Sequence, residues 1–153
     1  MYSAEIYRIL SRDPFTMKYF IGVYPSDKIP NFHTSESRAL VINTDKSSEP
    51  GRHWIAVFIE NNQHVEFFDS FGLPPEAYGS DITTFVRRYP QVSCNKIPFQ
   101  SLTSNVCGPY CIYFLVKRCQ GFCIYSIVSN LIGKNNVFRM YQFVKKRWCK
   151  YDF

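Results

Sequence analysis

The sequence predicts one α+β domain over residues 1–153. Residues 54–59 (WIAVFI) are continuously apolar, which suits a central strand buried on both faces of a sheet. Residues 107–119 carry apolar side chains nearly all round a helical repeat, which predicts a central buried helix. The expected helices and strands do not alternate regularly along the chain. This order favours an α+β fold over a doubly wound sheet.

The composition is that of a globular protein, with 46% hydrophobic and 18% aromatic residues. Residues 1–10 have no basic start and no long apolar run, so we expect no secretory signal. The longest apolar stretch, residues 106–116, is well short of the roughly 20 residues that cross a bilayer. We therefore expect an intracellular monomer that is neither secreted nor inserted in a membrane.

The N-terminal part of the chain reads as one helix and two strands joined by turns. Residues 3–10 have the pattern of an amphipathic helix, and residues 19–23 that of a short strand or extended segment. Residues 25–37 are rich in turn-forming residues. A buried strand is expected at residues 38–43, followed by a polar loop at residues 44–52.

A hairpin is expected to pair the central strand with residues 64–69, because Asn61-Asn62 tolerates the positive φ of a tight turn. Pro74-Pro75 can begin a helix that continues to Arg88. Residues 92–99 read as an edge strand whose pairing Pro98 limits.

Three helices are expected in the C-terminal part. Asn105 is the predicted N-cap of the helix at residues 107–119. Helices at residues 123–131 and 136–150 follow. The buried stripe of the last helix is predicted to consist of Val137, Met140, Tyr141, Val144 and Trp148.

Six cysteines occur in the chain, and without a secretory signal we expect most of them to be reduced. Zinc is the metal that four of these cysteines could hold: Cys107, Cys111, Cys119 and Cys123. They are separated by three, seven and three residues and form no CxxC pair, so no metal site is predicted.

Four residues occur in an order that suits acyl transfer by a thiol: His53, Asp69, Gln100 and Cys107. Cys107 opens the predicted central helix, where backbone N–H groups and the helix dipole stabilise a thiolate. His53 lies between a polar loop and the central strand and can act as its base. The hairpin should bring Asp69 close enough to orient the imidazole. Gln100 can donate a hydrogen bond to a developing oxyanion.

Each of these residues also has a purely structural explanation. Cys107 could be an ordinary buried cysteine, His53 a loop histidine, Asp69 a turn residue or helix cap, and Gln100 a solvent-facing side chain. The prediction depends on the ordered set of four.

Trp54 reads as core or as a lid over the histidine, and Gly108 lets substrate or backbone approach closely. The other two histidines, His33 and His64, read as ordinary surface residues.

The net charge of +6 is uneven along the chain, and the C-terminal segment is rich in basic residues. They can form a solvated helix face or attract nucleic acid or another polyanion, and both readings stay open. The residues considered for a DNA contact are Arg139, Lys145, Lys146 and Arg147.

Three segments resemble adenain, the adenovirus-type maturation cysteine protease, and more distantly the SUMO-deconjugating cysteine proteases. They are residues 51–58 (GRHWIAVF), 66–72 (EFFDSFG) and 100–111 (QSLTSNVCGPYC). Residues 19–44 add the F-x-G-x-Y stretch at residues 20–24, a Pro-x-Phe at residues 30–32 and ALVINT. The resemblance covers roughly residues 5–115.

The resemblance implies a papain-like fold in permuted order, with the histidine before the cysteine. It assigns Cys107 as nucleophile, His53 as base, Asp69 as orienting acid and Gln100 as oxyanion donor. It also implies cleavage after small residues, often Gly, in capsid or core precursors of a DNA virus or a virus-like Maverick or Polinton element. The expected location is then the host nucleus or cytoplasm and the virion.

No cofactor is expected for the chemistry. By resemblance, DNA and a disulfide-linked basic peptide are expected activators, and Cys94 is the cysteine placed for that disulfide. The leading hypothesis is a cysteine endopeptidase acting on structural precursor proteins. The alternatives are an isopeptidase for ubiquitin-like modifiers and a non-enzymatic basic module that binds DNA or capsid.

Overall fold

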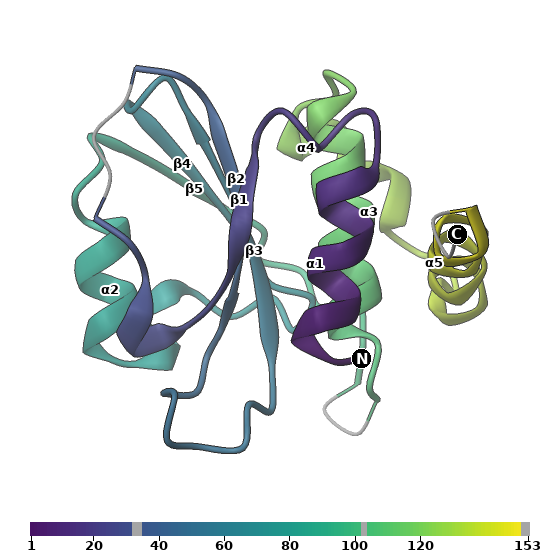
Figure 1. The fold of residues 1–153 in the computed structure, drawn as a ribbon, viewed down its shortest axis with the longest axis horizontal. Coiled ribbons are helices and arrows are strands. Elements are labelled where there is room, and N and C mark those ends of the chain that lie inside the picture. The colour runs from purple at the N-terminus through teal and green to yellow at the C-terminus, as the bar shows by residue number, and fades with distance from the viewer. Residues whose placement is uncertain (32–34, 102–103, 151–153) are drawn as a thin grey trace.

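A five-stranded mixed sheet separates two helical layers in the computed structural model, which describes residues 1–31, 35–101 and 104–150 (Figure 1). The strands lie in chain order across the sheet. The two outer pairs, β1–β2 and β4–β5, are parallel, and the inner pairs are antiparallel. The strands are β1 (Phe20–Pro25), β2 (Arg38–Asn43), β3 (Trp54–Glu60), β4 (His64–Phe68) and β5 (Gln91–Cys94).

The helices divide unevenly between the two faces of the sheet (Figure 1). On one face, α1 and α3 pack against the strands and α5 packs outside α3, while α2 covers the other face. The helices are α1 (Ser3–Arg12), α2 (Ser80–Val86), α3 (Cys107–Cys119), α4 (Ile124–Leu131) and α5 (Val137–Lys150), with the short 3₁₀ helices η1 (Ser26–Lys28) and η2 (Pro75–Tyr78).

The alternation of side chains along β2 and β3 builds two cores at once. Ala56 and Phe58 of β3 face α1 and α3, whereas Ile55 and Val57 face α2. The continuous apolar run of the sequence is therefore a strand buried on both faces, as expected. The predicted α+β fold class is confirmed.

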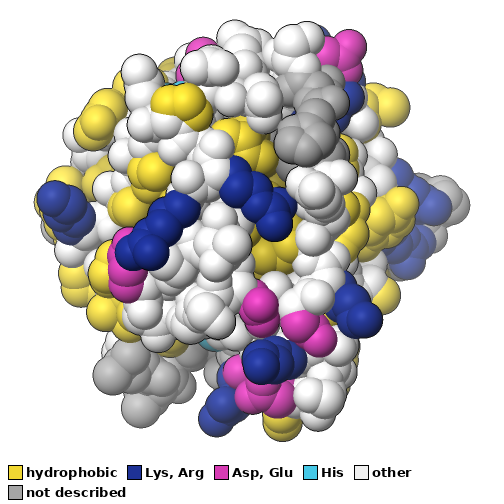
Figure 2. Space-filling view, turned by 90° about the vertical axis from the view of Figure 1, so that its left-hand side faces the viewer, with side chains coloured by type: hydrophobic (Ala, Val, Ile, Leu, Met, Phe, Trp, Pro, Cys, Tyr) yellow, Lys and Arg dark blue, Asp and Glu magenta, His cyan; other side chains and the backbone are white. Residues whose placement is uncertain are grey.

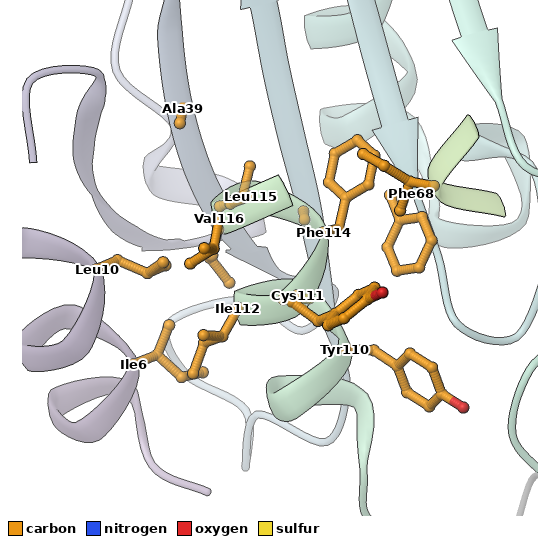
Figure 3. Close-up of a cluster of buried hydrophobic side chains, with 14 of the residues drawn as sticks. Ile6, Leu10, Ala39, Phe68, Tyr110, Cys111, Ile112, Phe114, Leu115 and Val116 are labelled. Atoms are coloured by element: carbon orange, nitrogen blue, oxygen red, sulfur yellow. The ribbon is translucent and has the colours of Figure 1, made fainter. Parts of the chain in front are cut away.

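Helix α3 is the centre of the larger core. All residues from Cys107 to Val116 are buried, which confirms the prediction of a central helix. Phe114 stacks on Phe68 of β4 with ring centroids 4.6 Å apart and an interplanar angle of 5°. Figure 3 shows Ile6 and Leu10 of α1 reaching the opposite side of this helix. The helix thus packs against both α1 and the sheet.

The predicted helix from Pro74-Pro75 to Arg88 is wrong in its middle. Gly79 adopts φ +94°, which interrupts the helix and separates η2 from α2. The predicted strand at residues 92–99 is also too long. The chain leaves the sheet after Cys94, because the side chain of Asn95 bonds to the backbone of Asp69 instead.

Two further details differ from expectation. Val106, not Asn105, is the N-cap residue of α3, and its side chain makes no capping hydrogen bond. In α5, Met140 is buried as predicted, but Val137 and Tyr141 are exposed. The helix packs against its neighbours along a narrow side that includes Phe143, Val144 and Trp148.

The hairpin turn has the expected geometry, since Asn61 and Asn62 have φ values of 50° and 58°. In the part of the chain that the structure describes, no helix has the length and apolar character needed to span a bilayer. Figure 2 shows the α2 side of the molecule, where acidic and basic side chains gather at the lower end, near the loop between β2 and β3.

Candidate active site

The hairpin of β3 and β4 brings His53 and Asp69 together. His53 directly precedes β3 and Asp69 directly follows β4, so antiparallel pairing places both at the same end of the sheet. The His53 Nε2 atom lies 2.6 Å from Asp69 Oδ1. His53 is 6% exposed and Asp69 is fully buried. The two residues therefore form a buried, hydrogen-bonded pair, as the hairpin prediction requires.

Four donors surround the Asp69 carboxylate. Oδ1 accepts from His53 and from the backbone N–H of Phe71 at 3.1 Å. Oδ2 accepts from the Tyr78 hydroxyl at 2.5 Å and from the backbone N–H of Leu73 at 3.1 Å. Hydrogen bonds to both oxygens hold the carboxylate in a single orientation.

Three residues that support this pair were missed by the sequence analysis. Tyr78 donates to Asp69, and burial followed by the neighbouring carboxylate raises the pKa of its hydroxyl. The Asn95 side chain brackets the Asp69 backbone, accepting from its N–H at 2.8 Å and donating to its carbonyl oxygen. Phe71 stacks on the His53 ring at 4.2 Å. Of the three, only Phe71 lies in a segment that resembles adenain, residues 66–72 (EFFDSFG), and no sequence signal marked Tyr78 or Asn95.

Cys107 lies on the other side of the histidine. It is the first residue of α3 and is 8% exposed. Burial acts to raise the pKa of its thiol, but the His53 ring and the backbone N–H groups of Trp54 and Gly108 outweigh this and lower it. Burial likewise acts to lower the pKa of His53, but Asp69 and Cys107 raise it to about 9. The site therefore favours a thiolate beside an imidazolium.

The uncapped start of α3 contributes to this electrostatic balance. The N-cap residue Val106 makes no side-chain hydrogen bond, Pro109 has no N–H, and the Tyr110 N–H bonds to the Val106 carbonyl oxygen, so the N–H groups of Cys107 and Gly108 are the donors of this turn that can face an anion. The backbone N–H of Gly108 already acts on the sulfur of Cys107. The missing cap at Asn105 is thus consistent with a charged nucleophile at this position.

Gln100 lies seven residues before Cys107, but its side-chain amide bonds to the loop that leads into α3. Its Nε2 donates to the carbonyl oxygen of Ser104 at 3.3 Å, and its backbone N–H bonds to the carbonyl of Ser70. Its Oε1 is buried and lacks a hydrogen-bond partner among the described residues. The role of Gln100 as oxyanion donor stays a prediction.

The N-terminal residues close over the site, which the sequence did not reveal. The indole Nε1 of half-buried Trp54 donates to the carbonyl oxygen of Met1 at 3.2 Å. A Cβ at Gly108 would lie 3.1 Å from the side chain of Met1. Gly108 therefore leaves room for the Met1 side chain, and its predicted role of admitting substrate or backbone stays a prediction.

The remaining candidates lie elsewhere. His64 bonds to Ser93 at 2.6 Å at the far end of β4, and His33 falls outside the described residues. Cys94 is a half-buried free thiol of β5, and burial followed by the charge of Glu76 raises its pKa. Its place in a disulfide stays a prediction.

The basic residues of α5 are partly engaged within the molecule. Arg139 donates to the Tyr113 hydroxyl at 2.7 Å, and Arg147 pairs with Asp13 at 3.0 Å. Lys145 and Lys146 belong to the same helix. A DNA contact by these four residues stays a prediction.

Two viral proteins are similar to this chain in sequence. One is R355 of Acanthamoeba polyphaga mimivirus, named as a candidate thiol protease, which is 30% identical over 103 residues. The other is the cysteine protease S273R of African swine fever virus, which is 24% identical over 110 residues. The alignments cover 62% and 65% of this chain but only 34% and 40% of the two viral proteins. No protein-family model matches the chain.

Solved structures show the same fold. The crystal structure of the African swine fever virus pS273R protease matches with a TM-score of 0.55 at 24% identity, over 71% of this chain and 43% of that one. The central domain of the uncharacterized protein Lpg1148 of Legionella pneumophila matches with a TM-score of 0.57 at 13% identity, over 99% and 97% of the two chains. The structure of ChlaDub1 from Chlamydia trachomatis matches with a TM-score of 0.53 at 15% identity, over 76% of this chain and 60% of that one.

The two sequence relatives are named as viral thiol or cysteine proteases, and neither is adenain, so the sequence similarity supports a viral cysteine protease and does not point to adenain specifically. The chain shares its α+β fold with the crystal structure of the African swine fever virus protease, and it is similar in sequence to two viral proteins named as thiol or cysteine proteases.

Proposed function

We propose that this chain is a cysteine peptidase in which Cys107 is the nucleophile, His53 the general base and acid, and Asp69 the orienting group. One observation carries the proposal. The buried His53 ring is held by Asp69 at 2.6 Å and lies beside Cys107, whose thiol pKa is lowered while that of the imidazole is raised. This is the electrostatic arrangement that activates a thiol.

The reaction follows from these positions. The Cys107 thiolate attacks the scissile carbonyl carbon, and the carbonyl oxygen becomes an oxyanion. The N–H groups at the uncapped start of α3 can stabilise this charge, and the Gln100 amide is the second proposed donor. The His53 imidazolium then gives its proton to the leaving amine. Water, deprotonated by the same ring, hydrolyses the thioester and restores the free thiolate.

The proposed substrates are structural precursor proteins of a virus or virus-like element, cleaved after small residues such as Gly. The viral origin of both sequence relatives supports this substrate class. No cofactor is needed for the steps above. DNA and a disulfide-linked basic peptide are proposed activators, to be tested through Cys94 and the basic residues of α5.

Thiol reactivity tests the proposed site. The protein is treated with limiting iodoacetamide from pH 4 to 9, with and without DNA, and the alkylated cysteine is mapped by mass spectrometry. We expect Cys107 to react below the ordinary thiol pH range, because the His53 ring and the backbone N–H groups of Trp54 and Gly108 lower its pKa. The exposed, free Cys123 serves as the reference thiol. His53→Ala should abolish this early reaction. His64→Ala is the matched control and should leave it unchanged.

Substrate panels separate the peptidase from its alternatives. Capsid-type precursors and peptides with a small residue before the scissile bond should be cleaved, and Cys107→Ala should be inactive. Processing of only a Gly-Gly-tailed ubiquitin-like protein would instead identify an isopeptidase. If Cys107 reacts no faster than Cys123, with or without DNA and basic peptide, the peptidase proposal fails and the non-enzymatic binding module is favoured.

A further inference from the structure

A cavity of about 430 Å³ lies at the end of the sheet where β3 begins, and its lining does not include His53, Asp69 or Cys107. Its walls come from the N-terminal residues, the ends of β1 and β2, and the loop that joins β2 to β3. Trp54, directly after His53, forms part of its lining. The residues that matter most to its chemistry are Asn43, Asp45, Gly51 and Trp54.

The cavity is rigidly connected to the proposed catalytic base. Asn43 pairs with Trp54 across β2 and β3, and the backbone N–H of Thr44 bonds to the carbonyl oxygen of His53 at 2.9 Å. Asp45 fixes the rest of the loop, since it accepts the backbone N–H groups of Gly51 and Arg52. A group bound in this cavity would therefore be held at a defined distance from His53.

Asn43 provides an unused hydrogen-bond donor in this cavity. The residue is only 3% exposed. Its Oδ1 accepts the backbone N–H of Asp45 at 2.9 Å, which fixes the orientation of the amide. Its Nδ2 is buried and has no hydrogen-bond partner among the described residues. A buried amide donor left without a partner is unfavourable, so a ligand that supplies an acceptor would stabilise it.

Gly51 keeps space open next to this donor. The residue adopts φ +80°, and a Cβ there would lie 3.2 Å from Asn43 Nδ2, with this nitrogen as its nearest neighbour. A larger residue would therefore crowd the amide. The glycine serves both the backbone turn and the space beside the nitrogen.

We propose that this cavity is a specificity subsite for the substrate peptide, in which Asn43 Nδ2 donates a hydrogen bond to a carbonyl oxygen of the bound chain. The acceptor is either a backbone carbonyl or the side-chain carbonyl of Gln or Asn. The inference rests on the proposed peptidase function and adds to it a residue that selects substrate without taking part in the chemistry. The volume and the mixed apolar and polar lining suit a peptide segment.

Asn43→Asp tests the proposal, because it retains the oxygen that accepts from Asp45 and replaces the donor with an anionic oxygen. We expect kcat/KM for the cleaved peptides to fall about tenfold or more, mainly through KM. Alkylation of Cys107 by iodoacetamide should stay at the wild-type rate, because this small reagent does not need the cavity. Asn130→Asp, an exposed asparagine of α4, controls for the added charge.

A second pair of measurements identifies the acceptor. Each backbone carbonyl of the peptide is replaced in turn by a thioamide, and each Gln or Asn by Leu. The change that removes the true acceptor should slow the wild-type enzyme but have little further effect on Asn43→Asp. Gly51→Ala should raise KM in the same direction by crowding the amide.

The outcomes distinguish this inference from the proposed function. If the wild type cleaves peptides and Asn43→Asp cleaves all of them equally well, the subsite is refuted and the peptidase proposal stands. If every peptide change affects both enzymes equally, the hydrogen bond from Asn43 is refuted. If the wild type cleaves no peptide with DNA and basic peptide present, and Cys107 reacts no faster than Cys123, the peptidase proposal fails and the subsite, which rests on it, fails with it.

Discussion

Tyr78→Phe removes one hydrogen bond from the centre of the site and almost nothing else. The Tyr78 hydroxyl is one of four donors to the Asp69 carboxylate, and Phe retains the ring that packs near His53. A hydrogen bond to a charged, buried acceptor contributes about 1.5–3 kcal/mol to stability. Phe71 and Leu73 continue to donate through their backbone N–H groups, so the carboxylate should remain in place.

The expected loss can be measured in two ways. For a chain of this length, each 1 kcal/mol lowers Tm by about 2–4 °C, so calorimetry should show a fall of roughly 3–12 °C. If about 1.4 kcal/mol of this is lost from the orientation of the His53 imidazolium, kcat falls about tenfold. Tyr89→Phe is the matched control. Tyr89 is 8% exposed, and its hydroxyl forms no hydrogen bond with any of the described residues.

The reasoning would be refuted if Tyr78→Phe retained both the Tm and the kcat of the wild type while Tyr89→Phe did so too. The hydroxyl of Tyr78 would then add nothing to the network around Asp69. An equal loss of stability in both variants, with kcat unchanged, would show that only ring packing had been perturbed.

Three other expectations concern charge and backbone. Arg118→Met leaves the buried Glu66 without its partner at 2.7 Å and should cost about 3–5 kcal/mol in urea unfolding, most of it regained when Glu66→Gln is added. The pH profile of kcat/KM should fall on the acid side as the Cys107 thiolate is protonated, at a pH below the ordinary thiol range. On the alkaline side it should fall as His53 loses its proton near pH 9. Gly72→Ala should lower the free energy of unfolding by at least about 1–3 kcal/mol and slow alkylation of Cys107, since φ is +72° and a Cβ would lie 2.8 Å from the backbone of Ile97 and Pro98. Unchanged unfolding and alkylation would contradict this.

Much of the fold could be predicted because its signals are local. The apolar run of β3 and the apolar surface of α3 depend on neighbouring residues, and both elements were predicted at nearly their observed bounds. The turn at Asn61-Asn62 set the register of β3 and β4. That register in turn predicted that His53 and Asp69 meet.

The errors occur where a distant group competes with local preference. Gly79 interrupts an otherwise helical stretch, and the Tyr78 before it reaches back to Asp69. Asn95 leaves the edge strand for a backbone 26 residues earlier in the chain. Neither event leaves a periodic pattern that a sequence window could detect.

The sequence by itself determined the order of elements, the two-sided burial of the sheet, and the set of four residues suited to thiol chemistry. Only the tertiary structure decided how the site is supported: the four donors on Asp69, the uncapped start of α3, the cover of Met1 over Gly108, and the unused donor of Asn43. The physical reason is range. Hydrophobic periodicity is written in residues a few positions apart, whereas hydrogen bonds and pKa values depend on whichever groups the folded chain brings within about 3 Å.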